Sequence, residues 1–422
     1  MQHISITKNN LLLIALTSIV GLSGLFYILL DRKPTVKIGI LHSLSGSQAI
    51  SEKPMVDAEL MAIEEINAQK KFLKYTIVPV IADGKSDETV FAQEAERLII
   101  QEKVSAIIGC WTSASRKAVK NVVEKHNNLL IYPVSYEGLE DSPNILYLGA
   151  NQNQQIVPSA LWSFLNLGKR FFLVGSDYIY SRVANEIIKK VLNAVNGTLL
   201  GEEYILLGSN NINPMVQAIV SAKPDVIINT IQGESNIAFF NALRAANITP
   251  ETVPVMSISS MSETEFVHIG NSAMSGDYVT ASYFQSIDRE ENVQFVQRLR
   301  KKYGPQRVIS EAVETAYTGI YLWAQAIEFA QSYDPQLVKK HLYNKVFNAP
   351  SGIVYTDNKT LDLWKMIYVG KLRSDGQFTI VWDSKKQVQP LNYPIFSDRS
   401  VWDTMIINLY ENWGRAWSNT AH

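Results

Sequence analysis

The chain has 422 residues, which is long enough for two or more domains. Its 39 basic and 40 acidic side chains nearly cancel, and this balance argues against a nucleic-acid-binding surface, which needs a clustered basic excess. The single cysteine, Cys110, rules out an internal disulfide and a cysteine-ligated zinc site. We expect Cys110 to be a small buried hydrophobe rather than a catalytic nucleophile. Because the six histidines show no metal-ligand spacing, we expect no metal and no cofactor.

An uncharged, apolar stretch runs from Leu11 to Leu30 near the start of the chain. A helix needs roughly 20 such residues to cross the core of a bilayer. The stretch ends at Asp31 with no small-x-small cleavage site. We therefore expect residues 1–34 to be an N-terminal transmembrane helix that anchors the chain, and a cleaved signal segment is the alternative.

Strand-like and helix-like segments alternate after this stretch, which predicts βαβ units and a parallel sheet. Apolar runs that predict strands, and periodic segments that predict helices between them, occupy residues 36–41, 56–67, 75–82, 91–101, 104–108, 115–123 and 129–132. Gly109 and Pro133 end the last two of these strands, and hydroxyl and aromatic residues follow both. Ligands of open α/β sheets bind at such carboxyl ends of strands.

The alternation restarts after residues 148–155, which are rich in Asn and Gln. Strands are predicted at residues 170–175, 226–230, 255–258 and 277–283, helices from about 182 and 236, a long helix at 310–331, and short strands within 352–384. This pattern predicts a second lobe built on the same βα logic as the first.

The tail at residues 391–422 differs from the rest of the chain. Within Val401–Trp417, apolar residues fall near one face of a predicted amphipathic helix; they are Trp402, Met405, Ile406, Leu409, Trp413 and Trp417. One interpretation is a terminal helix that packs on a lobe. The other is a tryptophan-rich contact with a membrane interface or a partner protein.

Several short motifs carry a family resemblance. They are Val36–Gly46, Gly109–Val119 (GCWTSASRKAV), Tyr132–Gly138 (YPVSYEG), Asn153–Gln155, Phe172–Tyr178 and Glu314–Trp323. These motifs resemble those of the substrate-binding proteins of urea and short-chain amide ABC transporters and of the related amide-sensing regulators. The resemblance covers about residues 36–385.

The resemblance implies a type I periplasmic-binding fold of the α/β class, with two Rossmann-like lobes joined by three crossover strands. The crossings are expected near residues 150–155, 281–285 and 346–352. Lobe 1 is then expected at residues 35–152, completed by 284–348. Lobe 2 is expected at 153–283, completed by 349–390.

A small amide is planar, polar and uncharged, and its binding needs paired hydrogen bonds because an unpaired buried polar group costs about 1–3 kcal/mol. Aromatic faces can enclose its plane and exclude water. The candidate wall in the first lobe consists of Trp111, Thr112, Ser113, Tyr132, Val134 and Ser135, and the candidates across the cleft are Tyr178, Tyr180, Gln232, Glu234 and Tyr283. The resemblance implies that Trp111, Ser113 and Tyr132 line the amide site. Outside this set, we expect Glu137 to be a structural partner of Arg116 or a cap rather than a ligand contact, and Asp177 to cap a helix.

The resemblance further implies a protein without enzymatic activity that closes about a hinge. It would bind urea or a short-chain amide on the periplasmic side of the cytoplasmic membrane, tethered by its N-terminal helix, and deliver the solute to an ABC permease. The alternative is a membrane-tethered sensor of the same fold that signals to a partner protein. An amidase-like enzyme is a third hypothesis, but no recognisable nucleophile motif stands beside a plausible base.

Overall fold

The computed structural model describes residues 33–420 apart from 70–71, 259–268 and 271–273. The apolar stretch at 11–30, and with it the expected membrane anchor, lies outside the described residues. Among the helices of the described part, none combines the length and apolar character needed to span a bilayer.

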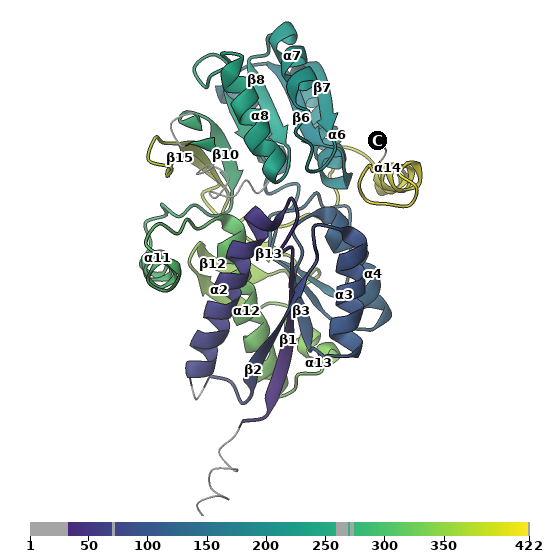
Figure 1. The fold of residues 1–422 in the computed structure, drawn as a ribbon, viewed down its shortest axis with the longest axis vertical. Coiled ribbons are helices and arrows are strands. Elements are labelled where there is room, and N and C mark those ends of the chain that lie inside the picture. The colour runs from purple at the N-terminus through teal and green to yellow at the C-terminus, as the bar shows by residue number, and fades with distance from the viewer. Residues whose placement is uncertain (1–32, 70–71, 259–268, 271–273, 421–422) are drawn as a thin grey trace, which may run out of the picture.

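A five-stranded parallel sheet, in the order β2-β1-β3-β4-β5, forms the centre of the first lobe. Its strands are β1 (Thr35–His42), β2 (Thr76–Asp83), β3 (Ala106–Gly109), β4 (Leu130–Tyr132) and β5 (Ile145–Tyr147). The helices α2 (Ala49–Ala68) and α12 (Glu311–Ala330) lie on one side of this sheet, and α3 (Glu88–Ile100) and α4 (Ser113–Lys125) lie on the other (Figure 1). Since both faces are covered, β3, β4 and β5 are buried along their whole length, which explains their continuous apolar runs.

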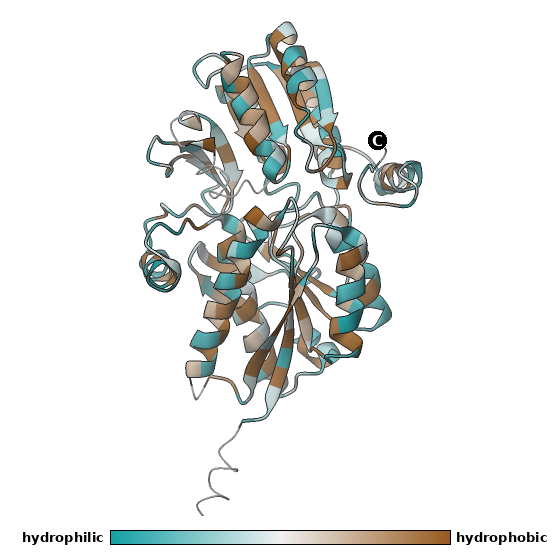
Figure 2. Ribbon diagram, viewed as in Figure 1, coloured by the Kyte–Doolittle hydropathy of each residue, from teal (hydrophilic) through white to brown (hydrophobic). Residues whose placement is uncertain are grey.

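A seven-stranded mixed sheet, in the order β15-β14-β10-β9-β8-β6-β7, forms the centre of the second lobe. Its strands are β6 (Arg170–Ser176), β7 (Thr198–Ile205), β8 (Val226–Thr230), β9 (Val255–Ser257), β10 (Tyr278–Ala281), β14 (Tyr368–Leu372) and β15 (Phe378–Asp383). Among the described residues before the tail, the helices of this lobe are α5 (Ile156–Asn166), α6 (Ile179–Ala194), α7 (Asn213–Ala222) and α8 (Glu234–Ala245). Figure 2 shows hydrophobic residues along the strands and on helix surfaces of both lobes.

The first lobe is completed by segments from later in the chain. They are α11 (Glu290–Tyr303), α12, α13 (Pro335–Lys340) and a small sheet of β11 (Val346–Ala349), β12 (Gly352–Thr356) and β13 (Leu363–Trp364). On α11, Arg298 pairs with Glu65 of α2, with 2.8 Å between Nε and Oε1. A bridge between Tyr147 and Asp362 places the small sheet beside β5.

Within the described residues up to β15, the chain passes between the two lobes at three places. The first two passages, at residues 148–155 and 282–289, lie close to the expected positions. The third lies between Trp364 and Tyr368, because β12 and β13 pair beside the first sheet whereas β14 joins the second. The expectation of a crossing near 346–352, with residues 349–390 completing the second lobe, was therefore too early in the chain.

Side chains of two of these passages donate to backbone carbonyls at or next to the other passages. Gln155 Nε2 donates to the carbonyl oxygen of Thr280 at 2.6 Å, and Gln154 Nε2 donates to that of Leu363 at 2.9 Å. The buried ammonium of Lys365 donates to the carbonyl oxygen of Leu148 at 2.8 Å. The three passages are thus tied into one unit at the boundary between the lobes.

The tail forms α14 (Arg399–Asn412), which packs on the second lobe through the buried Trp402. The helix ends at Asn412, so Trp413 and Trp417 lie beyond the helix in which the sequence pattern placed them.

The turn after β3 depends on Gly109. Its φ is +149°, and a Cβ atom at this position would lie 1.8 Å from the carbonyl oxygen of Leu41 in β1. Cys110 follows with φ +67°, and its side chain is fully buried. Burial raises the pKa of the Cys110 thiol, which is therefore protonated at neutral pH.

Replacing Gly109 tests this constraint. The Gly109→Ala variant should lose several degrees in thermal unfolding midpoint, because the new Cβ meets the backbone and a strained backbone costs about 1–3 kcal/mol. The control is Gly304→Ala, where φ is +113° but no atom lies within 4 Å of the added Cβ. Equal losses in the two variants, measured by differential scanning fluorimetry, would contradict a special role for Gly109.

Candidate functional site

The turn between β3 and α4 lies where the carboxyl ends of strands from the two sheets face each other, since Trp111 follows β3 and its partner Gln232 follows β8. Trp111 is 2 % exposed, and its Nε1 donates to Oε1 of Gln232 at 3.1 Å. Gln232 follows β8 of the second lobe, so this bond joins the lobes directly. Thr112 caps α4, since its hydroxyl accepts a hydrogen bond from the backbone amide of Ser115 at 3.0 Å.

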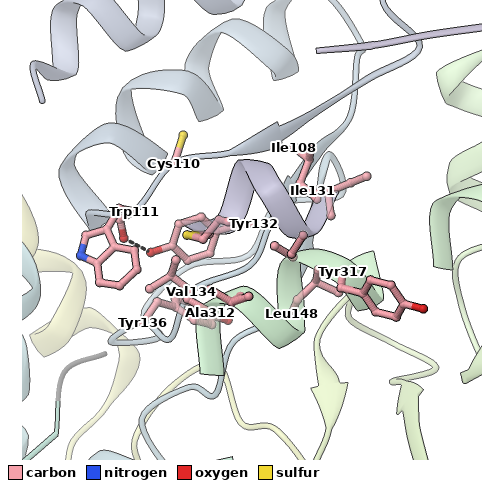
Figure 3. Close-up of a cluster of buried hydrophobic side chains, with 14 of the residues drawn as sticks. Ile108, Cys110, Trp111, Ile131, Tyr132, Val134, Tyr136, Leu148, Ala312 and Tyr317 are labelled. Atoms are coloured by element: carbon pink, nitrogen blue, oxygen red, sulfur yellow. Dashed lines mark hydrogen bonds between the residues drawn. The ribbon is translucent and has the colours of Figure 1, made fainter. Parts of the chain in front are cut away.

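Tyr132 fixes the same turn from the end of β4. Its hydroxyl donates to the carbonyl oxygen of Trp111 at 2.8 Å, as the dashed line in Figure 3 shows. Its ring meets that of Tyr136 edge to face, with 6.4 Å between centroids. Val134 lies beside both rings in Figure 3 and is 4 % exposed. The predicted residues Trp111, Tyr132 and Val134 therefore form one buried cluster, and Ser135 is buried next to it in the chain.

A buried network of ion pairs underlies this cluster. Arg116 donates from Nη2 to Oε1 of Glu137 at 3.0 Å and from Nε to Oε1 of Glu140 at 3.1 Å. Its Nη1 donates to the hydroxyl of Ser113 at 2.8 Å, and this hydroxyl donates to Oε2 of Glu137 at 2.5 Å. The expected pairing of Glu137 with Arg116 is confirmed. The Ser113 hydroxyl, expected to face a ligand, is part of this network.

The network also sets the charge state of its carboxylates. Burial alone would raise the pKa of Glu140, but the charges of Lys117, Arg116 and Lys120 outweigh it and hold this pKa well below its usual range. The guanidinium of Arg116 lies 4.9 Å from the centroid of the Tyr132 ring. The charge of Arg116, which lies next to the aromatic cluster, is therefore balanced by the carboxylates of Glu137 and Glu140.

Two tyrosines of the second lobe face this cluster from the start of α6. Tyr178 and Tyr180 are each 2 % exposed, with 6.1 Å between their ring centroids. Burial raises the pKa of both phenols well above the usual value, and Tyr132 and Glu137 of the first lobe raise it further. Ala114 of α4 belongs to the same cluster of buried residues as these two tyrosines, which places them next to the first lobe.

The remaining predicted residues lie apart from this cluster. Glu234 is exposed at the first turn of α8, where the helix dipole favours a carboxylate. Tyr283 is buried behind β10, and its hydroxyl donates to Oδ1 of Asn292 at 2.7 Å. The expectation that Asp177 caps a helix was wrong: α6 has no side-chain cap, and Oδ1 of Asp177 accepts from Nε of Arg182 at 2.7 Å.

Sequence reasoning missed Tyr136 and Glu140. The ring of Tyr136 stacks on that of Tyr147, with 4.7 Å between centroids, and its hydroxyl donates to Oδ1 of Asp362 at 2.5 Å. Both missed residues stand in or next to the Tyr132–Gly138 motif, so the sequence contained a signal for them.

Comparison with known proteins connects this arrangement to a family. The family described as "Periplasmic binding protein domain" matches residues 36–399. A solute-binding protein of an ABC transporter from R. palustris, solved in complex with 4-hydroxybenzoate, superposes with a TM-score of 0.76; it is 23 % identical, and the match covers 84 % of this chain and 98 % of that one.

A leucine-binding protein from Thermotoga maritima gives a TM-score of 0.74 at 21 % identity, over 83 % of this chain and 98 % of that one. A branched-chain amino acid transporter substrate-binding protein from Streptococcus pneumoniae, in complex with isoleucine, gives 0.72 at 20 % identity, over 84 % and 100 %. At these identities the likeness shows a shared fold.

A curated relative matches only in part. A limonene hydroxylase of Geobacillus stearothermophilus is 39 % identical over 120 residues, which are 28 % of this chain. The match spans 22 % of the length of that protein.

Neutralising Glu140 tests the buried network. Because the folded state lowers the pKa of Glu140, its contribution to stability is full above its unfolded pKa of about 4.3 and is lost as pH falls below it. The Glu140→Gln variant should have a lower thermal midpoint at pH 7, since breaking a buried pair costs about 3–5 kcal/mol. Its midpoint should also fall less than that of the wild type between pH 5 and about pH 3.

The matched control is Glu411→Gln, which removes an exposed partner of Arg415. This control should leave the midpoint within the error of wild type. A Glu140→Gln variant with the stability and acid sensitivity of wild type would contradict the importance of the network.

Proposed function

The chain belongs to the periplasmic binding protein domain family, and from that premise we propose that it is an extracytoplasmic solute-binding protein. Its proposed ligand is urea or a short-chain amide, which it delivers to an ABC permease. It binds this solute between its lobes without transforming it. Its apolar N-terminal stretch would tether it to the membrane.

We propose an uncharged ligand because Arg116 is already paired with protein groups. Three of its nitrogens donate to Glu137, Glu140 and Ser113. A bound carboxylate would have to compete with two buried carboxylates for this guanidinium, and leaving either of them unpaired is costly. The two fold relatives described with ligands were solved with a carboxylate-bearing aromatic compound and an amino acid. The charge balance next to the aromatic cluster favours an uncharged solute in this protein instead.

The shape of the cluster supports a small planar solute. Trp111 and Tyr132 of the first lobe, and Tyr178 and Tyr180 of the second, bring aromatic side chains to the junction from both sides. Aromatic faces enclose a planar amide and exclude water, which strengthens its hydrogen bonds to the protein. The first lobe also supplies the start of α4, where backbone amides lack partners within the helix.

Hinge closure is the proposed mechanism. The bond between Trp111 and Gln232 spans the lobes and exists only when they are together. A solute that contacts both faces favours this closed arrangement over an open one. The interlobe passages, tied together by Gln154, Gln155 and Lys365, would absorb the change in backbone angles.

A membrane-tethered sensor of the same fold is the second candidate. It is favoured by the tail, because residues 400–422 extend beyond the family match and Trp417 within them hydrogen-bonds to both lobes. In that case a partner protein would detect the closed state.

A ligand screen tests the proposal. Purified residues 34–422 should show a higher thermal midpoint with urea, formamide or acetamide, since a ligand at 100 times its Kd stabilises the folded state by about 2.7 kcal/mol. Isoleucine and 4-hydroxybenzoate should give no shift. Stabilisation by these carboxylates alone would contradict an amide ligand.

Substitution of Trp111 tests hinge closure. The Trp111→Phe variant keeps an aromatic face but loses the donor to Gln232, and a hydrogen bond of this kind contributes about 0.5–1.5 kcal/mol. Calorimetric titration should show roughly 2–10-fold weaker binding of the amide. The control is Trp382→Phe on β15, which should leave affinity unchanged. Equal affinity in wild type and Trp111→Phe would show that the bond between Trp111 and Gln232 does not contribute to ligand binding, and would contradict its proposed role in closure.

A further inference from the structure

The last described residues of the chain are fastened to the second lobe. The amide of Ile179 donates to the carbonyl oxygen of Trp417 at 3.0 Å, at the start of α6. Asn419 donates from its backbone amide to the carbonyl oxygen of Asp177 at 2.9 Å and from Nδ2 to Oδ2 of the same residue at 2.7 Å. Tyr178 and Ser418 form an antiparallel bridge between these contacts. The segment thus runs along the start of the helix that carries Tyr178 and Tyr180.

The same residues also bind the first lobe. Glu88, the first residue of α3, accepts hydrogen bonds from the backbone amide of Trp417 at 3.0 Å and from the hydroxyl of Ser418 at 3.3 Å. The ammonium of Lys117 lies 5.1 Å from the centroid of the Trp417 indole. Lys117 in turn pairs with Glu140 at 3.0 Å. Trp417 therefore connects α3 and the buried ion-pair network to the second lobe.

The position of α14 makes the tail part of the second lobe. Trp402 is 1 % exposed and belongs to the hydrophobic core of that lobe, with Lys190 of α6 5.4 Å from its ring centroid. Figure 1 shows α14 beside α6 at the level where the lobes meet. When the lobes separate, the tail should move with α6, and the two bonds to Glu88 should break.

The tail has other contacts with the first lobe, and they lie next to the first interlobe passage. The amide of Leu139 donates to the carbonyl oxygen of Asn392 at 2.6 Å, and Nε2 of Gln152 donates to that of Leu391 at 3.0 Å. Arg399 pairs with Asp141 at 2.9 Å. Because atoms near a hinge move least, these contacts can persist when the lobes open.

We propose that Glu88 and residues 417–419 form a clasp that is made when the lobes close and that increases affinity for the solute. The clasp adjoins the predicted turn, because Glu88 and Ser418 line the same small cavity of about 40 Å³ as Thr112 and Ser115. Glu88 is thus a positioning residue that acts through closure. The effect on affinity rests on the proposed function, whereas the effect on the lobes does not.

The test uses the full chain and compares Glu88→Ala with Glu88→Gln. Small-angle X-ray scattering without ligand should give a larger radius of gyration for Glu88→Ala than for wild type. Calorimetric titration with urea should give at least a fivefold higher Kd for Glu88→Ala. The Glu88→Gln variant keeps one acceptor oxygen for the Trp417 amide, so its values should fall between the two. The control Glu411→Ala removes an exposed carboxylate of α14 and should match wild type.

A second variant tests the clasp independently, in case the Glu88→Ala variant does not fold. Removing residues 416–422 leaves α3 and α14 intact and should reproduce the expansion and the weaker binding. If wild type binds neither urea nor another amide, the proposed ligand fails, while the scattering comparison still decides the clasp. An unchanged radius of gyration in both Glu88→Ala and the truncated chain would overturn the clasp, as would an unchanged Kd in a wild type that binds urea.

Discussion

The structure depends on the buried pairing of Arg116 with Glu137 and Glu140. A guanidinium without exposure to solvent is stable only when carboxylates compensate its charge, and here two of them do so within 3.1 Å. The same network holds the Ser113 hydroxyl and lies under the ring of Tyr132. It therefore fixes the geometry of the β3–α4 turn, and it pairs the cations Arg116 and Lys117 of that turn with protein carboxylates. This pairing is the basis of the proposal that the ligand is uncharged.

Most of the first lobe could be predicted because its signals are local. The run before Gly109 and the hydroxyl residues after it predicted a strand, a turn and a helix, and the structure has β3 and α4 there. The position of the third passage was predicted wrongly because a local sequence pattern predicts a strand but not the strand with which it pairs. The apolar residues Val354 and Leu363 fit a strand of either lobe equally well. Only the pairing of their strands with β11 and β5 assigns them to the first lobe. The edge strand β7 was missed since most of its residues are partly or fully exposed, so it lacks the apolar run of an inner strand.

The candidate site could be predicted only in part, for a related reason. Trp111 and Tyr132 come together because they lie at the carboxyl ends of neighbouring strands, which the order of elements implies. Asp177 has the composition of a helix cap, yet its oxygens bind Arg182 and Asn419, and the second of these partners is far away in sequence. Trp417 continued the helical spacing of the tail, but the helix ends at Asn412 and the indole lies against Lys117 of the first lobe. Contacts between distant segments of the chain decided each of these outcomes.

The central claim is that the junction accepts a neutral guest and rejects its charged counterpart. Acetamide and acetate test it most directly, because they share one shape and differ in charge at pH 7. Calorimetric titration of the wild-type chain should give heat of binding with acetamide and none with acetate at the same concentrations. Binding of acetate as tight as that of acetamide, or tighter, would show that the Arg116 network does not exclude an anion and would contradict the account.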